Sequence, residues 1–144
     1  ESFFAWCREL GIATIADYMI GLPFERTAAD LERAYSFVKK LDPDYVQFSI
    51  CTLYPHTEMY EEAMRRGVVE RGRWDEFARK PVRGFVPDHW TEFFTVKELA
   101  HWQRRMYKRY YFRPRYVWRS VFRTRSLYEL AQKIFGAFRI LLAT

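Results

Sequence analysis

The chain has 144 residues, of which 49 % are apolar and 19 % aromatic, and so much apolar surface excludes a disordered chain. Charge is distributed unevenly along it. Residues 1–98 carry 13 basic and 17 acidic side chains, whereas residues 99–144 carry 11 basic side chains and one acidic. This asymmetry indicates an acidic body followed by a basic region.

Three further classes of protein are disfavoured. The apolar run near the C-terminus, Ile134–Phe138, is far shorter than the roughly 20 residues of a membrane span. The first residues lack the basic segment and cleavage motif of a signal peptide. Cys7 and Cys51 make no disulfide framework. We therefore expect a cytoplasmic protein with reduced thiols.

The first half of the chain predicts a strand, a helix and a second strand. Residues 3–10 form the end of a helix that Gly11 terminates, because glycine adopts the left-handed backbone found there. The apolar run at 12–20 predicts a strand covered on both faces, and Gly21–Arg26 predicts a turn. Thr27 begins a helix whose apolar side chains recur at helical spacing: Leu31, Ala34, Tyr35, Val38 and Leu41.

The second strand is predicted at residues 45–50, after Asp42-Pro43-Asp44 ends the helix. A helical crossover of this length makes the two strands parallel neighbours. The loops at 21–26 and 51–56 therefore leave the same end of both strands. At that end, α/β barrels and open α/β sheets bind their ligands.

The second half predicts mainly helices. Thr57 begins a helix at 58–66, and residues 68–94 are an irregular, aromatic-rich segment. Thr95 and Glu98 form a capping box that opens a long helix to about residue 112. A short helix is expected at 115–123 and a last one from 126 to about 142.

Candidate binding groups follow the two strands. Gly21-Leu22-Pro23 lets a ligand approach the backbone, and Glu25 offers acceptors to an amine or a ribose hydroxyl, but the pattern alone favours an ordinary turn between a strand and a helix. Gln47 and Ser49 share one strand face, which is either a ligand-lined interior or a solvated surface. His56 is either a base or ligand, or an exposed side chain without a role. We expect no metal site within this chain, because its cysteines and histidines do not form a ligand set.

The basic stretch after residue 100 is open to two interpretations. Its arginines alternate with aromatic residues, which suits RNA or an anionic membrane surface, through residues 104–125. A non-catalytic module of that kind, located at the membrane periphery, is the alternative hypothesis for the whole chain, and nucleic acid is the less favoured ligand. The favoured interpretation is that the arginines pair with the acidic body while the aromatic residues pack.

Four short motifs occur in an order that is similar to a known enzyme family. Residues 21–25 read GLPFE, 41–44 read LDPD, 54–60 read YPHTEMY and 111–116 read YFRPRY. They resemble the GLPGET, LxPD, PGTxLY and FYxRPxY motifs of radical S-adenosylmethionine enzymes, in particular of the subgroup with an N-terminal cobalamin-binding domain.

The resemblance implies an α/β fold. Residues 1–94 would be the last two strands and helices of a (β/α) barrel, and residues 95–144 an all-α basic extension. Enzymes of this family use a 4Fe–4S cluster to cleave S-adenosylmethionine into a 5′-deoxyadenosyl radical. The resemblance implies cofactor-binding or substrate-facing roles for these residues: Ile20, Gly21, Leu22, Pro23, Glu25, Gln47, Ser49 and Tyr54.

The chain also departs from the family pattern. Phe24 and Arg26 replace the second glycine and the threonine of GLPGET, and His56 replaces the glycine of PGT. The cluster-binding CxxxCxxC motif is absent. We therefore expect a fragment that is inactive alone. Its cluster ligands, and any cobalamin, would belong to a missing N-terminal part of the same protein, and its small-molecule substrate is not identified.

Overall fold

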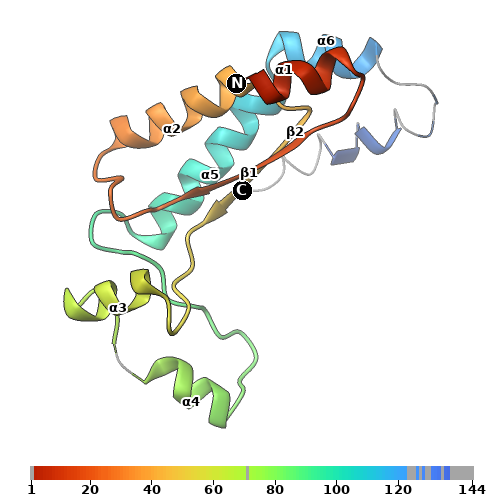
Figure 1. Ribbon diagram of the computed structural model, residues 1–144. Coiled ribbons are helices and arrows are strands. Elements are labelled where there is room, and N and C mark those ends of the chain that lie inside the picture. Colours follow the sequence, from red (N-terminus) through yellow and green to blue (C-terminus); the bar gives the residue numbers. More distant parts are fainter. Residues whose placement is uncertain are drawn as a thin grey trace.

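The computed structural model describes residues 2–70, 72–122, 126, 128, 131–133 and 135–136. This part of the chain is a mixed α/β structure (Figure 1). Its elements, in chain order, are α1 (Ser2–Glu9), β1 (Ile15–Ile20), α2 (Ala28–Leu41), β2 (Tyr45–Ile50), α3 (Glu58–Arg65), α4 (Arg73–Arg79), α5 (Val96–Tyr111) and α6 (Pro114–Phe122).

β1 and β2 form a parallel two-stranded sheet, which confirms the predicted strand, helix and strand. Ile15 lies opposite Tyr45, and Ile20 lies opposite Ile50. Helix α2 makes the crossover between the strands. A capping box of Thr27 and Asp30 begins this helix, and Asp42 ends it with a left-handed backbone, at φ 49°.

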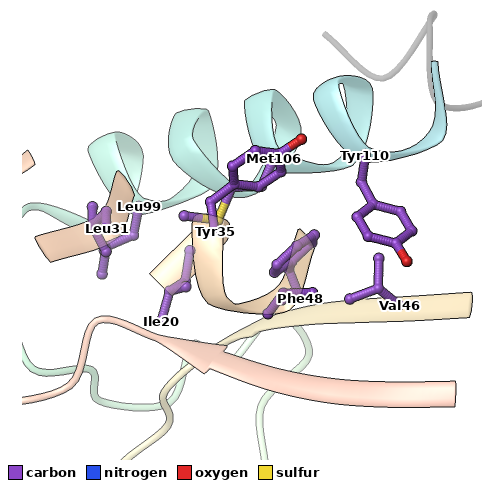
Figure 2. Packing of buried hydrophobic residues seen from close by; sticks show 9 residues of the cluster. Ile20, Leu31, Tyr35, Val46, Phe48, Leu99, Met106 and Tyr110 are labelled. Atoms are coloured by element: carbon purple, nitrogen blue, oxygen red, sulfur yellow. The ribbon is translucent and has the colours of Figure 1, made fainter. Parts of the chain in front are cut away.

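One face of the sheet is buried beneath α2 and α5 (Figure 1). Figure 2 shows the side chains of this core meeting between the strands and the two helices. The members of the cluster are Ile20, Leu31, Tyr35, Val38, Val46, Phe48, Leu99, Met106 and Tyr110. Helix α5, although distant in sequence, therefore belongs to the same core as the strands.

The opposite face of the sheet is uncovered, and here the sequence-based expectation was wrong. Burial alternates along β1, and Ile15 and Met19 are 61 % and 53 % exposed. The apolar run predicted cover on both faces, but no element of the described chain packs on the second face.

The outer edge of β2 is closed by side chains from α5. Val46 N–H donates to the Tyr111 hydroxyl (3.0 Å), which in turn donates to the Val46 carbonyl (2.8 Å). Tyr107 makes the same pair of hydrogen bonds with Phe48, at 2.9 and 3.2 Å, and Gln103 Nε2 also donates to the Phe48 carbonyl. Peptide groups that another strand would pair are thus satisfied by a helix.

Helices α3 and α4 lie away from the two strands (Figure 1), and a second, smaller core packs there. It contains Leu53, Tyr60, Ala63 and Trp90, with Trp74 of α4 packed against it. Helix α4 lies within the segment predicted to be irregular. Only seven residues long, it presents too short a periodic pattern to be recognised.

Ion pairs join the basic region to the acidic body, as the favoured interpretation expected. Glu32 of α2 accepts from Arg109 of α5 at 2.6 Å. Asp42 faces four guanidinium groups, with closest N–O distances between 2.7 and 3.8 Å: Arg8, Arg113, Arg115 and Arg119.

The other predicted helices differ from the observed ones by a residue at their ends. Helix α3 ends at Arg65, and α6 begins at Pro114. The helix predicted from Ser126 falls mostly outside the described residues. Within the described part of the chain, no helix combines the length and apolar character needed to cross a membrane.

Asp42→Asn is expected to release α6 from the body. Asparagine tolerates the left-handed backbone but removes the charge that faces Arg113 and Arg119, which are mostly buried. Breaking such a pair costs about 3 kcal/mol, or roughly a 100-fold larger open population. Trypsin should therefore cut faster after Arg115 and Arg119, as followed by mass spectrometry.

The control is Asp17→Asn, which changes an exposed aspartate on the uncovered sheet face. It should leave the cleavage rate unchanged. Equal rates in the two variants would contradict the role assigned to Asp42.

Candidate functional site

The loops after the two strands lie at the same end of the sheet, as the topology predicted. Cys51 N–H donates to the Ile20 carbonyl at 2.8 Å, which joins the start of the second loop to the end of β1. Ile20 itself is fully buried in the core. It therefore positions the loop with its backbone, and its side chain is not available to a ligand.

Glu25 is turned onto its own loop. Its Oε2 accepts hydrogen bonds from the N–H groups of Gly21 (2.7 Å) and Leu22 (3.0 Å). The residue is only 3 % exposed, and its second oxygen, Oε1, has no hydrogen-bond partner in the described structure. Glu25 thus closes the turn and keeps one buried acceptor unused.

Burial governs the ionisation of the groups around this turn. It is the largest cause of the raised pKa of Glu25, which the hydrogen bonds from the Leu22 and Gly21 N–H groups lower only in part. Burial also raises the pKa of Tyr18 and of the Cys51 thiol, and the nearby Glu25 carboxylate adds to both shifts. Cys51 is therefore a buried, protonated thiol and not an activated nucleophile.

Gly21 is required for packing. Its φ is 80°, and a Cβ at this position would lie 2.7 Å from Cδ1 of Leu99 in α5. The absence of a side chain thus lets α5 approach the turn. The structure thus gives this glycine a role in core packing, in addition to the role that the sequence suggested, which was to let a ligand approach the backbone.

Polar side chains gather on the uncovered face of the sheet. Gln47 and Ser49 lie on β2, with Gln47 Nε2 3.5 Å from Ser49 Oγ. Asp17 lies directly opposite Gln47 in the register and is also exposed. Sequence reasoning missed Asp17, although its place two residues before Met19 on the same face was a usable signal. These three residues can donate to and accept from a polar ligand.

The second loop is held by the segment before α5. Leu53 N–H donates to the Asp88 carbonyl at 2.8 Å, and His89 Nδ1 lies 2.8 Å from the Cys51 carbonyl oxygen. Tyr54 is exposed, and its ring lies 5.5 Å from that of Trp74.

His56 follows Tyr54 in the second loop. It adopts a left-handed backbone, φ 63°, at the position where the family motif has glycine. Its side chain lines an open hollow of about 550 Å³ with Thr57, Glu58, Glu61 and Arg65, beside the start of α3.

In the first loop, Leu22 and Pro23 are half-buried, while Phe24 is largely exposed to solvent.

A metal site is not found among the described residues, where no three His, Cys, Asp or Glu side chains converge. Cys7 and Cys51 are both buried. Cys7 precedes β1 and Cys51 follows β2, so they lie at opposite ends of the parallel pair, about 20 Å apart at the usual rise per residue of a strand.

One curated protein is similar to this chain. It is a protein of Pyrococcus horikoshii named "Uncharacterized methyltransferase", 29 % identical over 116 residues. The match covers 80 % of this chain but 24 % of that protein, so the chain spans about a quarter of the length of its relative. No family model matches the chain, and no solved structure matches it.

Gly21→Ala is expected to destabilise the protein more than Gly11→Ala. Both glycines have positive φ, which costs alanine about 1 kcal/mol, but nothing lies within 4 Å of a Cβ at Gly11. At Gly21 the clash with Leu99 adds about 1–3 kcal/mol of overpacking. Denaturant midpoints of the two variants measure the difference. Equal losses of stability would show that Leu99 yields freely.

Glu25→Gln is expected to become more stable relative to the parent as pH rises. Because folding raises the pKa of Glu25, its stabilising contribution is full below the unfolded pKa and is lost as pH rises through the folded pKa. Glutamine accepts the same two N–H groups without ionising. Denaturation midpoints between about pH 4 and pH 8 test this.

Glu98→Gln provides a control of opposite sign. Hydrogen bonds from the Thr95 backbone and hydroxyl lower the pKa of Glu98, so its contribution is present at high pH and is lost as pH falls. That variant should lose stability relative to the parent as pH rises. The assignment of Glu25 fails if both variants follow the same trend.

Proposed function

We propose that this chain is the C-terminal part of the catalytic barrel of an S-adenosylmethionine-dependent methyltransferase of the radical type. The similarity to a protein named as a methyltransferase supports the reaction class. The order of the GLPFE, LDPD and YPHTEMY motifs supports the radical type. The whole enzyme's substrate remains unassigned.

The observation that carries this proposal is the one-sidedness of the sheet. Tyr107 and Tyr111 close the outer edge of β2, so a further strand cannot pair with Val46 or Phe48. No strand pairs with the outer edge of β1 in the described residues. The last two strands of an open barrel have the same arrangement. The final strand has a closed outer edge, and the remaining strands pair beside β1.

The uncovered face fits the interior of that barrel. Helices α2 and α5 cover the other face, as helices cover the outside of an α/β barrel. The uncovered face carries Asp17 and Gln47 near the middle of the two strands, and Ser49 close to the end where both loops emerge. In this arrangement the three side chains point toward a ligand held inside the barrel.

The residues fit S-adenosylmethionine in part. Gln47 and Ser49 offer hydrogen bonds to its hydroxyl and amino groups, and Tyr54 offers an exposed ring. Glu25 is a weaker candidate, because its Oε2 is held by the Gly21 and Leu22 N–H groups. S-adenosylmethionine supplies the transferable methyl group, or the adenosyl radical in radical enzymes.

The residues present do not fit a 4Fe–4S cluster. The two cysteines are buried at opposite ends of the sheet, and the described residues hold no other ligand set. In this proposal, the cluster ligands and a cobalamin domain belong to the part of the enzyme that precedes this chain. The roles derived for this chain are therefore to bind and orient the ligand.

The test uses the protein made from its complete gene, reconstituted with iron under anaerobic conditions. It should release 5′-deoxyadenosine when reduced with S-adenosylmethionine. Ser49→Ala and Gln47→Leu should each weaken S-adenosylmethionine binding about tenfold, the effect of one lost hydrogen bond. Equilibrium dialysis measures the affinity.

Ser36→Ala is the matched control, because Ser36 is exposed on α2, away from the uncovered face. It should bind as the parent does. A gene without an upstream CxxxCxxC motif would exclude the radical type. Unchanged affinity in Ser49→Ala and Gln47→Leu would exclude the proposed face as the binding surface.

A further inference from the structure

Helix α6 has its apolar side turned outward. Pro114 and four apolar residues recur at helical spacing and form one stripe along the helix. The four apolar side chains are between 43 % and 75 % exposed: Val117, Trp118, Val121 and Phe122. A surface helix normally turns this side to the core.

The opposite side of α6 holds the helix in this orientation. The Tyr116 ring packs against Tyr110 and Tyr111 of α5, at centroid distances of 5.7 and 5.0 Å. Arg119 donates to the Asp42 carboxylate at 2.7 Å and to the Pro43 carbonyl at 3.1 Å. Rotating α6 to bury its apolar stripe would break all of these contacts.

Positive charge in excess lies beside the stripe. The Asp42 carboxylate, only 10 % exposed, is surrounded by four guanidinium groups and neutralises one of their charges. Arg115 is the outermost of the four, with 81 % of its side chain exposed and an N–O distance of 3.7 Å. It follows Pro114 on the edge of the apolar stripe, and its exposed N–H groups can bind a second anion in addition to Asp42.

We propose that α6 lies in the surface of an anionic lipid bilayer. The stacked rings of Trp118 and Phe122, 5.4 Å apart, enter the interface between headgroups and acyl chains with the two valines. Arg115 binds headgroup phosphates, and the unneutralised charge around Asp42 attracts the anionic surface.

RNA fits this surface less well. Two members of the exposed apolar stripe, Val117 and Val121, offer no ring on which a base can stack. Several arginines of the basic stretch are already paired within the protein: Arg105 and Arg109 with Glu32, and Arg113 and Arg119 with Asp42. In the described part of the basic stretch, these pairings reduce the number of guanidinium groups that can follow a phosphate backbone.

The proposed lipid-binding surface on α6 lies far from the candidate site. Asp42 precedes β2, whereas the loops with Gly21 and Tyr54 follow the strands, so the two lie at opposite ends of the sheet. Figure 1 shows α6 at one end of the molecule and α3 at the other. A protein bound through α6 therefore keeps its candidate site directed away from the lipid, and membrane binding is separable from the proposed catalysis.

The test is vesicle co-sedimentation of the protein made from its complete gene. Vesicles of phosphatidylcholine with about 30 % phosphatidylglycerol should bind the protein, and vesicles of phosphatidylcholine alone should bind it at least tenfold more weakly. The double variant W118S/F122S should reduce binding to the anionic vesicles at least tenfold, and Arg115→Gln should reduce it about fivefold, the effect of one cation at an anionic surface.

Matched controls distinguish binding through this surface from non-specific adsorption of the protein to vesicles. Phe37→Ser changes an exposed phenylalanine on α2, and Arg33→Gln changes an exposed arginine on the same helix. Both should bind as the parent does. The variant V117S/V121S leaves both aromatic residues in place, so it tests the stripe again if W118S/F122S fails to fold.

Three outcomes would overturn the proposal. The first is a parent protein that does not bind the anionic vesicles. The second is an equal loss of binding in the α6 variants and the α2 controls. The third is binding of a single-stranded RNA oligonucleotide that displaces the vesicles and depends on Trp118 and Phe122.

Discussion

The architecture depends on the hydrogen bonds between the α5 tyrosines and the edge of β2. Tyr107 and Tyr111 each donate to and accept from the backbone of one β2 residue, and Tyr110 donates to the Pro43 carbonyl at 2.6 Å. Because buried peptide groups must be paired, these hydroxyls replace an absent strand. Burial raises the pKa of Tyr110 to about 12, so its hydroxyl keeps its proton at ordinary pH.

This closure of the β2 edge makes the two edges and the two faces of the sheet different. β2 is a terminal strand, α5 is locked across one face of the sheet, and the other face keeps its polar side chains exposed. The same helix packs Leu99 against Gly21 and so supports the turn that leads into the candidate site. At its other end α5 leads into α6, whose arginines meet Asp42. Both the candidate site and the proposed lipid surface therefore rest on α5.

Local patterns foretold the elements better than they foretold the roles of residues. The strand, helix and strand follow from apolar spacing and from the caps at Thr27 and Thr95, which act over a few residues. The sequence left Glu25 open as an acceptor for a ligand or as part of an ordinary turn, and in the structure its Oε2 accepts from the N–H groups of Gly21 and Leu22 in its own loop. Cover on both faces of β1 was expected from its composition, which cannot reveal what lies beside it.

The sequence by itself determined the parallel strands and the common end of their loops, and it favoured the pairing of a basic region with an acidic body. These follow from chain connectivity, from the periodicity of short segments and from the summed charge of each part of the chain. Only the tertiary structure decided that Tyr107 and Tyr111 end the sheet, that Asp17 joins Gln47, and that α6 turns its apolar stripe outward. Each of these depends on which distant side chain reaches a given backbone group or face, and a linear pattern does not contain that information.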